Sequence, residues 1–198
     1  MSRKGLNNNN IITAAIEMVE EKGYRNYSLR ELAGKLNVQP SSLYNHISGI
    51  EEINTAVAMY GIQLLQEALE NAAKKEDMKE ALQQMAIEYR NFAHKNPELY
   101  QTIIDLQMSD NQVLKSELHK IIEPFRKVLE RELTDKYTII HLQRFFRSSL
   151  HGYVTLEREG YLKHYEVTSE ESFQFMILSF IDLIDSTKEK QRRSKENE

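Results

Sequence analysis

The chain has 198 residues, a net charge of −4 and no cysteine. Without a thiol it can form neither a disulfide nor a cysteine-type zinc site, and a reducing cytoplasm suits such a chain. No apolar run approaches the roughly 18 residues of a membrane helix, so we expect a cytoplasmic protein with no membrane partner. Three prolines and seven glycines are too few for long loops, which predicts a nearly all-helical fold with a real hydrophobic core.

We expect the first residues, 1–10, to form a polar arm ahead of the first helix. The arm carries Arg3, Lys4 and a run of asparagines at 7–10. Two alternatives stay open for it: a disordered tail, or a contact with phosphate or the minor groove of DNA. Gly23 ends the helix that follows. The apolar stripe of that helix consists of Ile12, Ala15, Ile16 and Val19.

Residues 28–37 predict a second, short helix with a well-marked start and end. Ser28 and Glu31 form an S-x-x-E capping box, in which the hydroxyl accepts from the Glu31 N–H and the carboxylate accepts from the Ser28 N–H. Asn37 tolerates the left-handed conformation that ends a helix. The apolar stripe of this helix consists of Leu29, Leu32, Ala33 and Leu36.

A third helix is predicted over 40–46, directly after that turn. Pro40 suits its first position, because proline presets φ and has no N–H to leave unbonded. Leu43 is its one clear apolar anchor, so the helix buries little. The other side chains are small or polar, which suits a groove lined by phosphates and base edges. Residues 28–46 are therefore a predicted helix-turn-helix.

The rest of the chain predicts six further helices with few breaks. Helical spacing and capping residues place them over 50–73, 77–95, 97–106, 111–133, 137–159 and 169–187. We expect a turn at 108–110, a kink at Pro124 and a frayed, charged tail over 189–198. The predicted fold is all-α with about nine helices, divided into an arm and three-helix head in 1–47, a helical-bundle body in 48–188, and the tail.

Residues 11–53 resemble the N-terminal domain of the TetR family of bacterial transcriptional regulators. The resemblance rests on an Ile-x-x-Ala-Ala opening, the Lys22-Gly23-Tyr24 break, Ser28-Leu29-Arg30-Glu31-Leu32-Ala33, Val38, and Leu43-Tyr44-x-His46. It implies a DNA-binding head and a body that holds a small-molecule pocket and a dimer interface. The stretch FRSSLHGYVTLEREGYL is also similar to a C-terminal subgroup of the family with a His-Gly pair, here His151 and Gly152.

The resemblance also implies which side chains meet a double-stranded DNA operator. Arg30 would reach a guanine edge through its fork of donors, and Gln39 or Asn45 would pair with adenine. Tyr44 would contact the DNA backbone, with packing in the core as its alternative. The complete predicted set is Ser28, Arg30, Gln39, Pro40, Ser41, Ser42, Tyr44, Asn45 and His46.

One position departs from the family pattern. The family usually has a phosphate-binding Lys at the start of the fourth helix, where this chain has Ile50. Ser48 can still cap that helix, and the N–H groups of its first turn can still hold a phosphate. Residues 1–60 contain six Lys or Arg and six Asp or Glu, so the basic footprint of a DNA binder is weak. We expect DNA binding that is weaker, or less salt-dependent, than is usual for the fold.

The resemblance places the interface of a homodimer on the last two long helices. Small residues on the first of them allow close approach, and the second has a wide apolar stripe. The alternative is that both helices are buried within one chain. The predicted interface residues are Phe145, Ser149, Gly152, Leu156, Phe173, Ile177, Phe180, Ile181 and Ile184.

Aromatic side chains of the body supply a candidate pocket for an unknown small molecule. Its predicted lining is Tyr89, Phe92, Tyr100, Phe125, Phe146 and Tyr153. The alternative, that these rings pack in the core, is the more common outcome at helical spacing. No cofactor is expected, and no zinc site either, because no two histidines lie four residues apart and no HExxH motif occurs.

Three functions follow from the sequence. The leading hypothesis is a dimeric, ligand-responsive transcriptional regulator, a repressor that a small molecule releases from a palindromic operator. The alternative is a protein of the same fold that binds another protein instead of an operator. An enzyme is disfavoured, because the chain has no glycine-rich phosphate loop, nucleophile elbow or paired-carboxylate motif.

Overall fold

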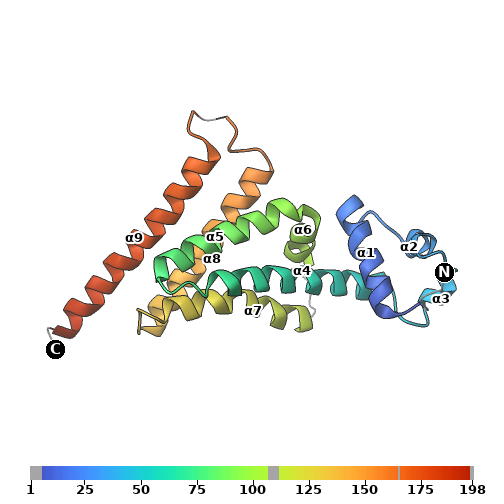
Figure 1. The fold of residues 1–198 in the computed structure, drawn as a ribbon, viewed down its shortest axis with the longest axis horizontal. Helices are drawn as coiled ribbons and strands as arrows, with labels where there is room; N and C mark the ends of the chain where they lie inside the picture. Colours follow the sequence, from blue (N-terminus) through green and yellow to red (C-terminus); the bar gives the residue numbers. More distant parts are fainter. Residues whose placement is uncertain (1–5, 107–111, 165, 197–198) are drawn as a thin grey trace. The chain divides into compact units, whose positions relative to one another are not determined.

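The structure is a computed structural model that describes residues 6–106, 112–164 and 166–196. Within these ranges the chain forms nine helices and no strand (Figure 1), which confirms the all-α prediction. The helices are α1 Asn8–Lys22, α2 Leu29–Lys35, α3 Pro40–Leu43, α4 Ile50–Ala72, α5 Met78–Lys95, α6 Pro97–Leu106, α7 Gln112–Leu129, α8 Lys136–Arg158 and α9 Ser169–Glu196.

The helices group into two compact units. The first unit comprises Met1–Leu64 and Lys95–Leu118, and the second comprises Leu65–His94 and His119–Glu198. Helix α4 therefore contributes its first turns to one unit and its last turns to the other. The predicted division into a head, a body and a tail remains a prediction.

In the first unit, α1 begins earlier than the sequence suggested. The Asn7 side chain accepts from the Asn10 N–H at 2.9 Å, so residues 8–10 are helical and not part of an arm. The helix ends as predicted at Gly23, whose φ of 82° favours glycine. Its buried stripe is centred on Ile11 and Ala15, while the predicted Ile12 and Ile16 lie half-buried. Arg3 and Lys4 lie outside the described residues.

The predicted capping box and turn are present around α2. The Glu31 N–H donates to Ser28 Oγ at 3.3 Å, and the Ser28 N–H donates to Glu31 Oε2 at 2.9 Å. Asn37 adopts the left-handed conformation with φ 55°. Helix α3 is shorter than predicted and stops at Leu43, after which the chain turns and the His46 N–H donates to the Leu43 carbonyl at 2.8 Å.

A buried hydrogen bond joins the segment before α2 to α4. The Tyr27 hydroxyl donates to Asn54 Oδ1 at 2.9 Å, and both side chains are buried. Burial, helped by the nearby Glu51 charge, raises the pKa of Tyr27 to about 12. The bond satisfies two polar groups that would otherwise be costly inside the core.

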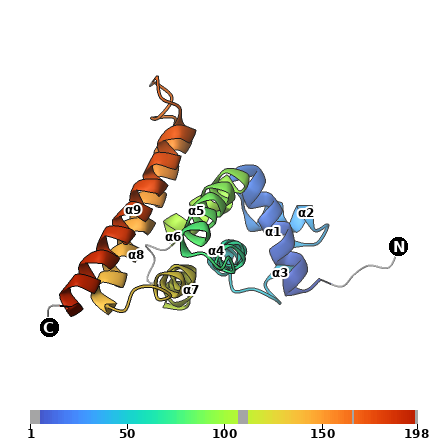
Figure 2. The same cartoon turned by 60° about the vertical axis from the view of Figure 1, so that its left-hand side comes forward.

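In the second unit, α8 and α9 lie side by side (Figures 1 and 2). Their shared core is aromatic: Phe146 stacks on Phe180 with ring centres 4.4 Å apart, and Phe125 meets Phe146 edge-on at 5.0 Å. Gly160 ends the α8 segment with a φ of 80°, close to the predicted end. No helix in the described ranges is both long and apolar enough to cross a membrane.

Two predicted boundaries in this unit needed correction. Helix α7 ends at Leu129, four residues early, because the chain turns over 130–133. Helix α9 begins at Ser169, as predicted, and Thr168 forms a capping box with Glu171 just ahead of it. Helix α9 continues to Glu196, so most of the predicted frayed tail is helical. The predicted turn at 108–110 lies outside the described residues, and the kink at Pro124 remains a prediction.

Candidate nucleic-acid interface

Helix α3 presents its polar side chains outward and one apolar side chain inward. Leu43 is fully buried and anchors the helix. Tyr44 is 59% exposed, which excludes core packing for its ring and leaves the phenol free to contact a partner. The other predicted contact residues of this segment are exposed or half-buried: Gln39, Pro40, Ser41, Ser42, Asn45 and His46.

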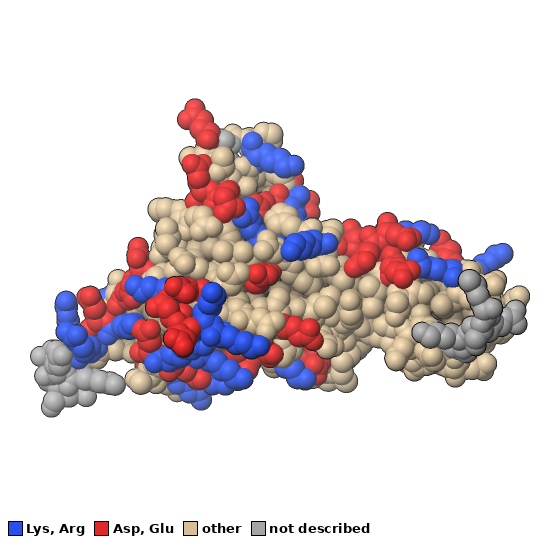
Figure 3. All heavy atoms as spheres, viewed as in Figure 1, with Lys and Arg blue, Asp and Glu red and all other residues tan. Residues whose placement is uncertain are grey.

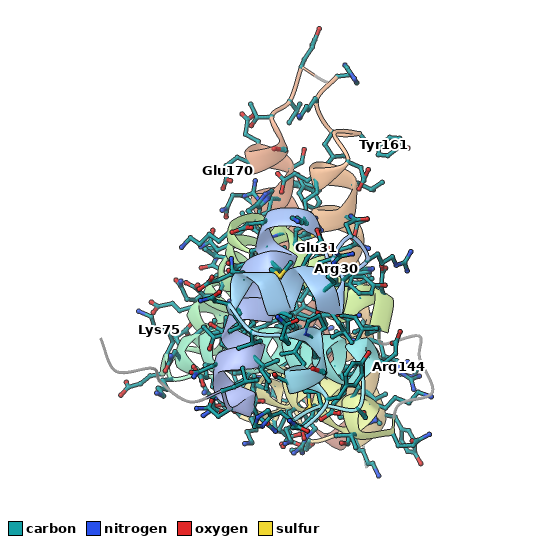
Figure 4. All side chains as sticks on the ribbon, turned by 90° about the vertical axis from the view of Figure 1, so that its right-hand side faces the viewer. Arg30, Glu31, Lys75, Arg144, Tyr161 and Glu170 are labelled. Carbon is teal, nitrogen blue, oxygen red and sulfur yellow. The ribbon has the colours of Figure 1, made fainter. Side chains whose placement is uncertain are left out.

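Arg30 stands out among the cations of this region. It is exposed on the first turn of α2, next to Glu31 (Figure 4), where the capping box fixes the backbone. Residues 6–64 contain three other cations, and each is already paired with a carboxylate. Arg30 has no ion pair with any described residue, so its guanidinium keeps all its donors for a phosphate or a base edge.

The paired cations are held within the protein. Lys22 Nζ lies 2.9 Å from Glu31 Oε1, and that contact, together with the Ser28 bonds, holds the pKa of Glu31 below its usual range. Lys35 Nζ lies 3.0 Å from Glu17 Oε2 and bridges to a second glutamate one turn later. Arg25 pairs with a carboxylate of α6. On the face shown in Figure 3, this region shows acidic atoms gathered in a patch with basic atoms at its edge, and no continuous basic surface.

The start of α4 is acidic where the family usually has a phosphate-binding Lys. Ile50 is followed by Glu51 and Glu52 in the first turn. The Ser48 N–H and hydroxyl both donate to Glu52 Oε2 at 2.7 Å, which holds the pKa of Glu52 below its usual range. The predicted cap would have the Ser48 hydroxyl accept from an N–H of the first turn. In the structure the hydroxyl instead donates to the carboxylate of Glu52 in the same helix. Two negative charges at this helix end disfavour a phosphate there.

The predicted dimer residues divide by helix. On α8, Phe145 and Leu156 are exposed and Ser149 and Gly152 are half-buried, so this face is accessible. On α9 all five predicted residues pack inside the chain, which agrees with the alternative that this side of the helix is buried within one chain. Those buried residues are Phe173, Ile177, Phe180, Ile181 and Ile184.

The accessible apolar side of α9 is formed by three residues that the sequence reasoning missed. They are Phe175, Leu178 and Leu183, with exposed fractions of 73%, 50% and 42%. Their spacing follows one helix face, offset from the buried stripe. A helix that is apolar on two sides shows both stripes in its sequence, but the sequence does not say which one faces the chain's own core.

The predicted pocket aromatics are core residues in the structure. Five of the six are buried, and the sixth, Tyr153, donates from its hydroxyl to the Ser169 carbonyl. Phe125 and Phe146 fill the contact between α7, α8 and α9 described above. Tyr100 belongs to the core of the first unit, whereas the other five belong to the second unit. The six rings therefore do not come from one unit. No cluster suited to a metal ion occurs among the described residues.

Comparison with known proteins agrees with this architecture. Residues 11–57 match the family model "Bacterial regulatory proteins, tetR family", and residues 82–180 match "Tetracyclin repressor-like, C-terminal domain". The chain belongs to the TetR family of transcriptional regulators, which are DNA-binding transcription factors and not enzymes.

Individual relatives cover nearly the whole chain. The HTH-type transcriptional regulator YobS of Bacillus subtilis is 29% identical over 182 residues, covering 90% of this chain and 93% of YobS. A Rhodococcus protein of unknown function shares the fold with a TM-score of 0.78 at 18% identity, covering 89% and 94% of the two chains. AibR, in complex with isovaleryl coenzyme A and operator DNA, shares it with a TM-score of 0.59 at 15% identity, covering 85% and 95%.

Proposed function

We propose that the chain acts as a homodimeric repressor, which binds a palindromic operator and is released from it by a small molecule. The observation that supports this most directly is the helix-turn-helix itself. Its Arg30 has no ion pair within the described part of the chain, and Ser41, Tyr44 and Asn45 are exposed nearby. Two copies would each place α3 in a major groove, with half-sites about one helical turn or more apart. The structure of AibR contains both isovaleryl coenzyme A and operator DNA. It supports the proposal that a protein of this fold binds an operator and a small molecule.

The exposed apolar faces of α8 and α9 support the homodimer. Five large apolar side chains on these two helices are exposed to water in the single chain, which is more than is usual at a surface without a partner. They are Phe145, Leu156, Phe175, Leu178 and Leu183. A second copy would cover them. A ligand that prefers one spacing of the two heads would then shift the population away from the DNA-bound form. The subgroup with His151 and Gly152 remains a prediction within this proposal.

The alternative, a protein-binding member of the fold, has its own supporting observation. Glu51 and Glu52 begin α4, and three of the four described cations of the head are neutralised within the protein. Such a head offers little electrostatic attraction to DNA.

Selection of bound sequences from a random double-stranded DNA pool at about 100 mM salt separates the two functions. An inverted repeat bound by the wild-type protein is expected for the repressor. Arg30→Gln should then lose about 1–3 kcal/mol of discrimination at one position of each half-site. Lys35→Gln is the matched control, because its charge is already compensated by glutamates. If no motif is recovered and only bulk, salt-sensitive binding remains, the protein-binding function is favoured.

A further inference from the structure

A groove in the second unit combines apolar and cationic side chains on α7 and α8. Its volume is about 520 Å³, a size that suits a small organic ligand. The side chains that matter for the argument are Ile122, Glu123, Ile140, Gln143, Arg144 and Arg147. None of them belongs to the predicted aromatic pocket, and none contributes to the nucleic-acid interface.

The two arginines of the groove are not neutralised by any carboxylate that the structure describes. Neither Arg144 nor Arg147 forms an ion pair with any described residue, although Arg144 is exposed (Figure 4) and Arg147 is half-buried. Helix α8 has no acidic residue before Glu157. Burial, and secondarily the charge of Arg147 one turn earlier, lower the pKa of His151.

The carboxylate that lines the groove is already occupied. Arg126 Nε donates to Glu123 Oε2 at 3.0 Å, and the pKa of Glu123 is held below its usual range by that arginine. Arg126 is shared between Glu123 and Glu130, so it offsets only part of the Glu123 charge, but the groove has two arginines against this one carboxylate. The groove keeps a net positive charge that a bound anion would neutralise.

The helix geometry separates this groove from the exposed apolar face of α8. Ile140, Arg144 and Arg147 recur at i, i+4 and i+7, so they form one stripe. At about 100° per residue, Gly152 shares a face with Phe145, and the residues of that face lie roughly 80–160° from those of the stripe. Gln143 Nε2 donates to the Ile122 carbonyl at 2.9 Å, which ties α8 to α7 at the groove. A second copy packed on the apolar face would leave the stripe uncovered.

We propose that the groove binds a small amphipathic anion. Arg144 and Arg147 would hold a phosphate or carboxylate head group, because guanidinium forks match the oxygens of both groups. Ile122 and Ile140 would cover a short apolar chain attached to it. Binding at this site depends on side chains of the second unit alone. It can therefore be tested without DNA, and its failure would not affect the proposed repressor function.

Calorimetric titration of the full chain, without DNA, tests the site with octyl phosphate and octanoate as probes. We expect one octyl phosphate per chain, and about tenfold or greater weakening in the double variant Arg144→Gln, Arg147→Gln. The matched control is Lys127→Gln, Lys136→Gln, which also removes one charge in or beside each helix but alters no lining residue. Equal weakening in both double variants, or no binding of octyl phosphate to the wild type, would overturn the proposal.

Two further titrations test the two halves of the ligand. Octanol should bind at least about tenfold more weakly than octyl phosphate, because it lacks the charge. Inorganic phosphate should also bind more weakly, because it lacks the chain; equal affinity would remove the apolar half of the proposal. The ratio of the octyl phosphate affinity to the octanoate affinity shows whether the groove prefers a phosphate or a carboxylate head group. The double variant Arg144→Lys, Arg147→Lys keeps both positive charges, so it should retain part of the binding. Complete loss of binding in this variant would contradict the role of charge.

Discussion

Arg90 of α5 holds Glu157 of α8 through two parallel contacts. Nη2 lies 2.6 Å from Oε1 and Nε lies 2.8 Å from Oε2, and both side chains are largely buried. His94 Nε2 lies 2.8 Å from Oε2 of the same carboxylate. Arg90 also pairs with Glu170 and lies over the Phe173 ring at 4.5 Å, so one guanidinium joins α5, α8 and α9.

Removing this arginine should destabilise the second unit. Arg90→Met leaves Glu157 buried without its main partner, which should cost about 2–3 kcal/mol of unfolding free energy. Glu170→Gln removes only the exposed partner and should cost less than about 1 kcal/mol. Urea unfolding followed by circular dichroism measures both. Equal losses would show that the exposed contact and the buried one contribute alike.

The same pair predicts a loss of stability in acid. Burial opposes ionisation of Glu157, but the bonds from Arg90 and His94 prevail and lower its pKa from 4.5 to about 2. Because the folded-state pKa is below the unfolded one, the stabilisation is complete above about pH 4.5 and is lost as the pH falls toward 2. The difference in unfolding free energy between wild type and Arg90→Met should therefore shrink across that range. A difference that stays constant with pH would contradict the assignment.

The buried bond between Tyr27 and Asn54 should stabilise the first unit. Tyr27→Phe leaves the Asn54 amide without its donor and should cost about 1–2 kcal/mol. The raised pKa, about 12, means that this stabilisation is present below pH 10 and is lost as the pH rises through 12. Tyr44→Phe is the control, because Tyr44 is exposed. Thermal unfolding of the three proteins at pH 8 measures the effect, and equal midpoints would contradict it.

Restoring the family's lysine should strengthen DNA binding. Ile50→Lys adds one phosphate contact at the start of α4, so the slope of log affinity against log salt should steepen by about one. Glu51 and Glu52 in the same turn will reduce the gain in affinity. Ile50→Gln controls for the loss of the apolar side chain. Fluorescence anisotropy on the selected operator at several salt concentrations gives the slope, and an unchanged slope would place Ile50 away from the DNA.

A charge on the exposed side of α9 should disrupt the proposed homodimer. Leu178→Glu places a carboxylate in the apolar contact, which should convert the dimer to a folded monomer. Tyr60→Glu, at an exposed position of α4, is the matched control. Sedimentation velocity gives the oligomeric state, with circular dichroism as the check on folding. A dimer that persists in Leu178→Glu would move the interface away from this face.

The local elements could be predicted from the sequence, because their signals lie within a few residues. The S-x-x-E capping box, Pro40 at the start of α3, Asn37 and Gly23 in the turns, and the helical periodicity all act through the nearest backbone. The family resemblance rests on the same local pattern, and the family models match it. Even here some boundaries moved: α1 starts early because the Asn7 side chain caps it, and α3 and α7 end early where the chain turns.

What the tertiary structure decided was which side of each helix meets the protein. Both sides of α9 are apolar, and only its packing on α8 shows that Phe173 and Ile177 face inward while Phe175 and Leu178 face water. Pairing of charges was likewise invisible, because it depends on distances between residues far apart in the chain. The free charge on Arg30 and the ion pair between Arg90 and Glu157 follow from folding, which alone brings distant side chains within bonding range.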